Sequence, residues 1–168
     1  MDNPVILEET LSKDLHISLL ELEQEEYLQM ELTLDLARKL IDIGKEKAKT
    51  DFNRPICIAI CDENGTLLTF DRMAGAPQRS IAISQQKAYT AARMGVSTDA
   101  FLARLQRENL EISFFCDPLF TALPGGNPLK DKSGKVIGCV GVSGLALQED
   151  QSITEHIAQL VAEENIAG

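Results

Sequence analysis

Glycine recurs along the most strand-like stretch of this chain. The run KVIGCVGVSGLAL places Gly138, Gly141 and Gly144 among β-branched and other apolar residues. Glycine weakens a strand because it offers no side chain for packing, so repeated glycine indicates that something approaches the backbone closely. Bulges and helix–sheet contact points explain such a pattern, and so does a ligand or a second subunit. The pattern alone leaves these alternatives open.

A second apolar run predicts a hairpin. ICIAIC, residues 56–61, is rich in β-branched residues and is followed by TLLTF, residues 66–70. Asn64 and Gly65 lie between the two runs, and this pair favours a tight turn because both residues tolerate positive φ. Two antiparallel strands are therefore expected here.

Helical periodicity predicts the remaining elements. Helices are expected over 15–30, after an N-cap at Thr33, over 80–94, over 98–109 and after Gln148. One or two short strands are expected in 112–123, whereas 124–128 is expected to be irregular because of its Pro and Gly content. Hairpins with helices gathered between them predict an α+β fold, in which helices cover an antiparallel sheet.

Composition limits the class of partner. With 168 residues and 44% apolar side chains, the chain suits one compact domain, and a net charge of −10 disfavours nucleic acid. No export signal and no apolar run of about 20 residues is visible, so a soluble cytoplasmic protein without membrane contact is expected. The cysteines lie in apolar stretches without a CxxC motif and are interpreted as reduced, buried residues.

Common catalytic motifs are not matched. Ser143 lies in Gly-Val-Ser-Gly, but a nucleophile elbow needs glycine two places after the serine, where Leu145 stands. His16 and His156 have no Cys or His at ligand spacing, so no metal site is predicted. Nucleotide-binding glycine motifs are also missing. No catalytic residue is assigned.

Two cations lie near the apolar and glycine-rich segments. Lys87 is part of an alanine-rich helix, from which its ammonium either reaches a pocket or extends along the helix rim to solvent. Arg72 follows the hairpin and either faces a ligand or pairs with Asp71 or Asp62. The amides of Gly125 and Gly126 are candidates for an anion-binding nest.

Three segments together resemble a known family. They are PICIAICDENGTLLTFDRMAGAP, SIAISQQKAYTAARMGVST and LPGGNPLKDKSGKVIGCVGVSGLALQED. In order and spacing they are similar to the GlcG/HbpS-like haem-binding or haem-degrading domains, which also form the C-terminal domain of PduO-type proteins. The matching positions are Arg72, Met73, Gly75, Lys87, Ala88, Thr90, Ala91, Gly125, Gly126, Pro128, Gly138, Gly141, Val142, Ser143, Gly144 and Asp150.

The resemblance implies a profilin-like α-β-α sandwich with a five-stranded antiparallel sheet. It assigns 33–168 to the family domain and leaves 1–32 as an N-terminal helical extension. It also implies a homodimer or larger homo-oligomer, and haem binding or breakdown in some members. No matched position is a histidine, the commonest haem ligand; Met73 and Tyr89 are weaker candidates.

These observations combine into one functional hypothesis and two alternatives. The hypothesis is an oligomer that binds a small anionic or tetrapyrrole ligand such as haem. Arg72 and Lys87 would supply charge, Gly125 and Gly126 backbone donors, and Ser143 a hydroxyl. The alternatives are a haem-degrading enzyme and a structural or accessory oligomer. If Lys87 faces a ligand, Lys87→Met should weaken haem binding and leave the melting temperature nearly unchanged.

Overall fold

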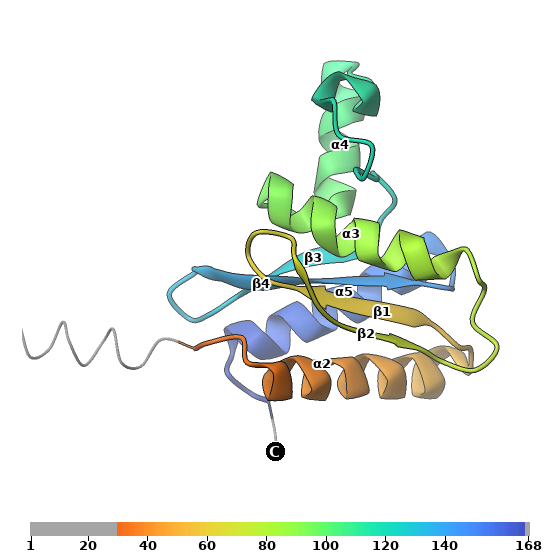
Figure 1. Ribbon diagram of the computed structural model, residues 1–168, viewed down its shortest axis with the longest axis vertical. Helices are drawn as coiled ribbons and strands as arrows, with labels where there is room; N and C mark the ends of the chain where they lie inside the picture. Colours follow the sequence, from red (N-terminus) through yellow and green to blue (C-terminus); the bar gives the residue numbers. More distant parts are fainter. Residues whose placement is uncertain (1–29, 167–168) are drawn as a thin grey trace, which may run out of the picture. The chain divides into compact units, whose positions relative to one another are not determined.

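The computed structural model describes residues 30–166, which form a mixed α+β fold (Figure 1). The helix expected over 15–30 lies, except for its last residue, outside the described residues, and the domain boundary at 32/33 stays a prediction. No helix in the described part of the chain is long and apolar enough to cross a membrane.

In the described part of the chain, four α-helices form where the periodicity predicts them. They are α2 (Leu34–Lys47), α3 (Ser80–Met94), α4 (Thr98–Glu108) and α5 (Leu147–Ala162). The hydroxyl of Thr33 accepts a hydrogen bond from the amide of Leu36 and thus caps α2 as expected. A short π-helical turn, η1 (Ala48–Phe52), extends α2.

The sheet has four strands, so the expected number of five is wrong for the described residues. The strands are β1 (Cys57–Cys61), β2 (Leu67–Arg72), β3 (Gly126–Lys130) and β4 (Val136–Ser143). Their order is β2-β1-β4-β3, and every neighbouring pair is antiparallel. The predicted hairpin is confirmed as β1 and β2.

The missing strand was expected within 112–123. This stretch instead holds a 3-10 turn, η2 (Ile112–Phe115), and irregular chain. Cys116 takes a left-handed conformation, and a carboxylate oxygen of Asp117 accepts the amide of Leu119. These turns override the strand preference of the aromatic residues.

The segment 124–128 was expected to be irregular. This expectation is wrong for residues 126–128, which are extended and paired as the beginning of β3. Gly126 lies opposite Gly141, and Pro128 lies opposite Cys139. Proline is tolerated because β3 is an edge strand, in which the amides on the outer side have no neighbouring strand to bond.

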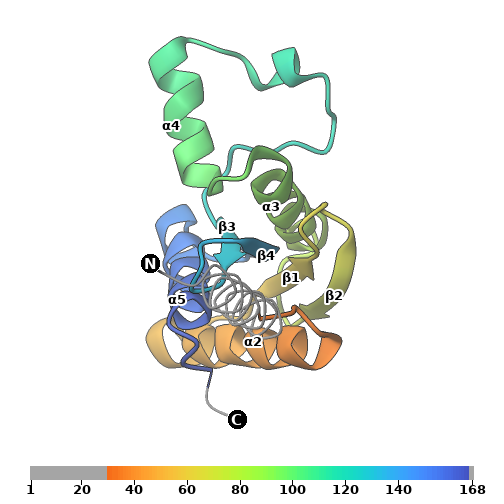
Figure 2. The ribbon, with the colours of Figure 1, turned by 90° about the vertical axis from the view of Figure 1, so that its left-hand side faces the viewer.

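Helices cover the sheet in two layers, with α3 on one face and α2 and α5 on the other (Figure 1). Gly141 lets α3 approach β4, since a Cβ there would overlap the carbonyl oxygen of Ser84. On the opposite face, Gly44 of α2 makes room for the side chains of Ile58 and Ile157. Helix α4 rises away from these layers, and the chain returns beside it (Figure 2).

Candidate functional site

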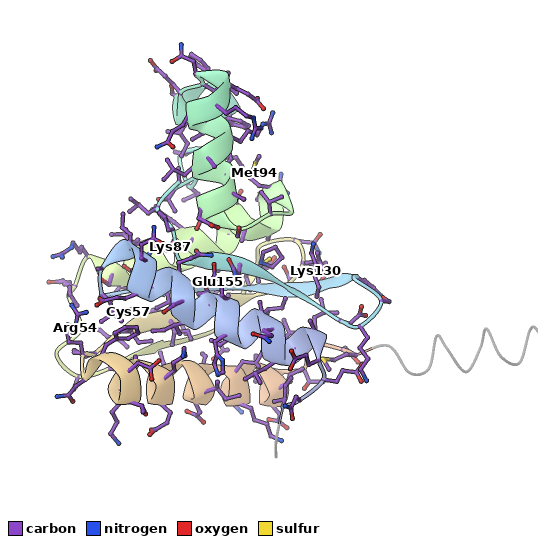
Figure 3. All side chains as sticks on the ribbon, turned by 180° about the vertical axis from the view of Figure 1, so that it is seen from behind. Arg54, Cys57, Lys87, Met94, Lys130 and Glu155 are labelled. Carbon is purple, nitrogen blue, oxygen red and sulfur yellow. The ribbon has the colours of Figure 1, made fainter. Side chains whose placement is uncertain are left out.

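Lys87, predicted as a candidate ligand cation, lies inside the protein. Its Nζ is 2.9 Å from Oδ2 of Asp150 and donates to the carbonyl oxygen of Val142 at 2.7 Å. The exposed fractions of the Lys87 and Asp150 side chains are 1% and 2%. Neither interpretation from the sequence, a cation at a pocket or a lysine at the helix rim, matches this arrangement (Figure 3).

Burial acts against both charges of this pair. It lowers the pKa of Lys87 and raises the pKa of Asp150, and the attraction between the two groups opposes each shift. Backbone donors support the carboxylate, because Oδ1 of Asp150 accepts the amide of Leu145 at 3.0 Å. The pair therefore joins α3 to the beginning of α5.

Gly125 and Gly126 pack directly against this ion pair. Gly125 has φ +115°, and a Cβ there would lie 2.8 Å from both Nζ of Lys87 and Cβ of Asp150. Its amide donates to Oε1 of Gln151 at 2.6 Å, and the amide of Gly126 donates to the hydroxyl of Thr98 at 2.9 Å. Both amides are thus used within the chain.

The bond to Thr98 connects the buried cluster with the base of α4. Thr98 is the first residue of α4 and is fully buried. We use the name Lys87 cluster for the five residues Lys87, Asp150, Gly125, Gly126 and Thr98. The cluster thus fixes where α4 begins relative to the sheet and the helices on its two faces.

Arg72 and Ser143 are not among the residues of the Lys87 cluster, and they lie on the two strands that flank β1. Both are register partners of Cys57, Arg72 on β2 and Ser143 on β4, so the three side chains point to the same face. The guanidinium of Arg72 donates to the carbonyl oxygen of Ala76 at 2.9 Å. Neither Asp71 nor Asp62 is its partner: Asp71 pairs with Lys45 instead. The structure therefore divides the predicted set into two groups.

A large hollow lies beside α4, and the sequence patterns did not reveal it. Its volume is about 600 Å³, and it is open to solvent. We call it the α4 hollow. It is lined by Leu102, Leu105, Gln106, Asn109, Leu110, Ile112, Phe120, Thr121, Ala122 and Leu123, none of which carries a charge. Its size is within the range of ligand sites, about 300–1,000 Å³.

Aromatic packing holds one wall of this hollow. The ring of Phe120 lies against those of Phe101 and Tyr89, at centroid distances of 5.9 and 6.1 Å. Phe101 is completely buried at the base of α4. The hydroxyl of Tyr89 donates to the carboxylate of Asp117 at 2.8 Å, which ties the returning chain to α3. That hydrogen bond raises the pKa of Tyr89.

A second, smaller cleft of about 330 Å³ lies between the β1–β2 turn and α3. Cys61, Leu67, Ile81, Gln86 and Tyr89 contribute to its walls. We call it the Cys61 cleft. Among residues 30–166, no group of three or more His, Cys, Asp or Glu gathers as a metal site would require.

The sequence signal for the Lys87 cluster was only partial. Residue type and position point to Lys87, Gly125 and Gly126, and the family resemblance includes Asp150, but neither predicts that Asp150 pairs with Lys87. Gln151 and Thr98 were missed as partners of the glycine amides. A lysine is almost never fully buried unless it is paired, so an acidic residue such as Asp150 is the expected partner of Lys87.

Comparisons with known proteins place this chain among its relatives. The GlcG protein of Escherichia coli K12 is 36% identical over 112 residues, which cover 67% of this chain and 81% of GlcG. The crystal structure of Klebsiella pneumoniae ORFY has a TM-score of 0.71 at 25% identity, covering 80% of this chain and 93% of ORFY. A PduOC–haem complex shows the same fold, with a TM-score of 0.69 at 23% identity, covering 77% of this chain and 94% of that one.

A family model extends over most of the chain. Residues 32–159 match the family described as haem-degrading protein HbpS-like. The matched range includes every residue of the Lys87 cluster and the whole lining of the α4 hollow. The resemblance noted in the sequence is thereby confirmed, and the chain belongs to the HbpS-like family.

Proposed function

We propose that this chain binds a tetrapyrrole such as haem in the α4 hollow. The observation that carries the proposal is the lining, which is uncharged and mainly apolar around a volume of about 600 Å³. An apolar surface of this size favours the flat body of a porphyrin, because burying it releases ordered water. The family description, haem-degrading protein HbpS-like, supports this class of ligand.

The lining fits the macrocycle but not an iron ligand. Haem iron takes His, Cys, Met or Tyr in most proteins, and none of these residue types lines the α4 hollow. With no cation in the lining, the propionates would point toward solvent. Binding would therefore depend on the porphyrin body and little on the metal.

Lys87, Gly125 and Gly126 then have a positioning role in this proposal. Their polar atoms are bonded within the chain, and through Thr98 they set the base of α4. Arg72 and Ser143, in the other group, stay predicted ligand contacts without a tested role.

Titration with haem and with iron-free protoporphyrin IX tests this proposal. Both should bind the full chain with comparable affinity, seen as a shifted Soret band for each. Leu123→Asp should weaken both by about tenfold or more, since a buried carboxylate opposes binding by more than about 1.4 kcal/mol. Leu147→Asp is the matched control, because the two leucines are 39% and 43% exposed and Leu147 lies at the start of α5.

Three results would contradict the proposal. Binding of haem without binding of protoporphyrin IX would show an iron ligand elsewhere. If Leu123→Asp and Leu147→Asp changed the affinity equally, the α4 hollow would not be the binding site. A Soret band that does not shift on titration, which means that haem does not bind, would favour the structural or accessory oligomer. Loss of the bound Soret band with reductant and oxygen would instead establish haem degradation.

Self-association is the second part of the proposal. Strand β2 is an edge of the sheet, and its first residues, Leu67 and Leu68, are 48% and 36% exposed. An open strand edge with apolar side chains favours pairing with another copy of the same strand. We propose that two chains associate through this edge.

A further inference from the structure

We propose that Cys61 and Cys139 form a site of reversible oxidation, in which a small peroxide converts the two thiols into a disulfide. The proposal is independent of haem binding. It depends on where the two residues lie in the sheet and on the cleft beside one of them.

The backbone already places the two cysteines at bridging distance. Cys61 of β1 and Cys139 of β4 are register partners on adjacent antiparallel strands. Such partners have Cα atoms about 4.5–5.5 Å apart, within the range of about 4.4–6.8 Å found in disulfides. Their side chains share a face of the sheet, so a bridge requires little backbone movement.

The thiol of Cys61 also contacts the backbone of Cys139. The Sγ of Cys61 lies 3.7 Å from the carbonyl oxygen of Cys139 and donates to it. Both residues belong to the apolar cluster beneath α3, together with Ala59, Ala88 and Ala91. A reagent therefore has to approach the pair through the cleft beside Cys61.

Only one of the two cysteine residues borders the described cleft. Cys61 contributes to the Cys61 cleft, and Cys139 does not. The interaction with the Cys61 side chain, followed by burial, raises the pKa of Cys139 far above its ordinary value. Cys61 is therefore assigned as the residue that reacts first, and Cys139 as the residue that completes the bridge.

The chemistry balances with hydrogen peroxide as the oxidant. The sulfur of Cys61 attacks one peroxide oxygen, the O–O bond breaks, and the products are a sulfenic acid and water. The sulfur of Cys139 then displaces the sulfenic oxygen, the S–S bond forms, and the thiol proton leaves with that oxygen as a second water. Two molecules of a cellular thiol reverse the bridge: the first forms a mixed disulfide with one cysteine, and the second releases that cysteine as a thiol and leaves as the oxidised disulfide.

The test uses the full chain carrying Cys116→Ser, which removes the exposed thiol and leaves the core unchanged. Mild peroxide treatment of the folded protein should cause a mass loss of two hydrogen atoms. Mapping without reduction should show a Cys61–Cys139 peptide pair. Further addition of Cys57→Ser should change nothing, because Cys57 lies opposite Ser143 and has no thiol partner.

Two further variants test the order of events and the route. Cys139→Ser should leave Cys61 as a sulfenic acid that a cyclic diketone captures. Leu67→Trp, in the wall of the cleft, should slow bridge formation severalfold, whereas Leu68→Trp should not, because Leu68 does not contribute to the wall. Leu68→Trp is the matched control, because both leucines are exposed and lie on the same strand.

Other outcomes would overturn the proposal. Free thiols at both positions after treatment, with circular dichroism showing a folded protein, would exclude the bridge. Sulfinic acid at Cys61 without a bridge would show that Cys139 cannot reach it. A bridge that includes Cys57 would show that partial unfolding, not sheet register, selects the pair.

Discussion

Lys87 and Asp150 connect helices that cover opposite faces of the sheet. The ammonium of Lys87, from α3, and the carboxylate of Asp150, in the first turn of α5, approach to 2.9 Å beside the end of β4. The carbonyl oxygen of Val142 and the amide of Leu145 complete their hydrogen bonds. This buried ion pair thus joins α3 to α5 at one end of β4.

Removing one partner of this pair should destabilise the protein strongly. Lys87→Met leaves the Asp150 carboxylate buried without its counter-charge, and such changes cost about 3–5 kcal/mol. The melting temperature should therefore fall, contrary to the expectation from the sequence that it stays nearly unchanged. Thermal and denaturant unfolding measure the difference.

The double variant Lys87→Met, Asp150→Leu is the control for this prediction. It removes both charges, so its loss of stability should be smaller than that of Lys87→Met alone. A double variant that is less stable by the sum of the two single losses would show that the pair is not coupled.

Gly141→Val should destabilise the contact between α3 and β4. The added Cβ would overlap the carbonyl oxygen of Ser84 and lie 3.1 Å from Cβ of Lys87. Overpacking of this kind costs about 1–3 kcal/mol or more, because a backbone atom must move. Gly95→Asn is the control, since nothing lies within 4 Å of a Cβ there and asparagine tolerates its φ of +67°. Unchanged melting of Gly141→Val would contradict the packing described.

Asp131 should make stability depend on pH on the acidic side. The hydroxyl of Ser133, followed by the amides of Lys135 and Ser133, holds the pKa of Asp131 below its ordinary value in the folded state. The stabilisation is complete above the unfolded pKa of about 4 and is lost as pH falls through the folded pKa. The stability gap between wild type and Asp131→Asn should therefore shrink toward about pH 3.

Chemical denaturation across this range checks the Asp131 prediction. Ser133→Ala removes the strongest donor to the carboxylate, so its own stability should vary less with pH between neutral and about pH 3. A stability difference between wild type and Asp131→Asn that widens on acidification would contradict the prediction.

Light scattering should give a mass of at least twice that of the 18.4 kDa chain at micromolar concentration. Leu68→Lys places a charge on the exposed β2 edge and should shift the mass toward the monomer, because charged edges resist pairing. A wild-type mass near 18.4 kDa would refute self-association. If Leu68→Lys kept the wild-type mass, the interface would lie on another surface.

The helices and the central strands were predictable because their patterns are local. Thr33, the Asn64-Gly65 turn and the alanine-rich run around Ala88 each specify an element within a few residues. Strand β3 was not predictable in this way, since Gly126 and Pro128 disfavour a strand and pair only because β4 lies beside them.

The candidate site shows the same division. Lys87, Gly125 and Gly126 attracted attention through their residue types, but their partners come from α4 and α5, far along the chain. The α4 hollow has no sequence signature, because irregular chain after η2 forms one of its walls. Periodicity cannot describe a surface built by a returning loop.

The strand order has a consequence for the order in which the chain folds during synthesis. Strand β1 pairs at once with β2, but its other edge waits for β4, and Cys61 and Cys139 are 78 residues apart. Until the ribosome has released β4, α3 also lacks Gly141 beneath it. A nascent chain that ends before Val136 thus exposes an apolar strand edge, a form open to aggregation or to chaperone capture.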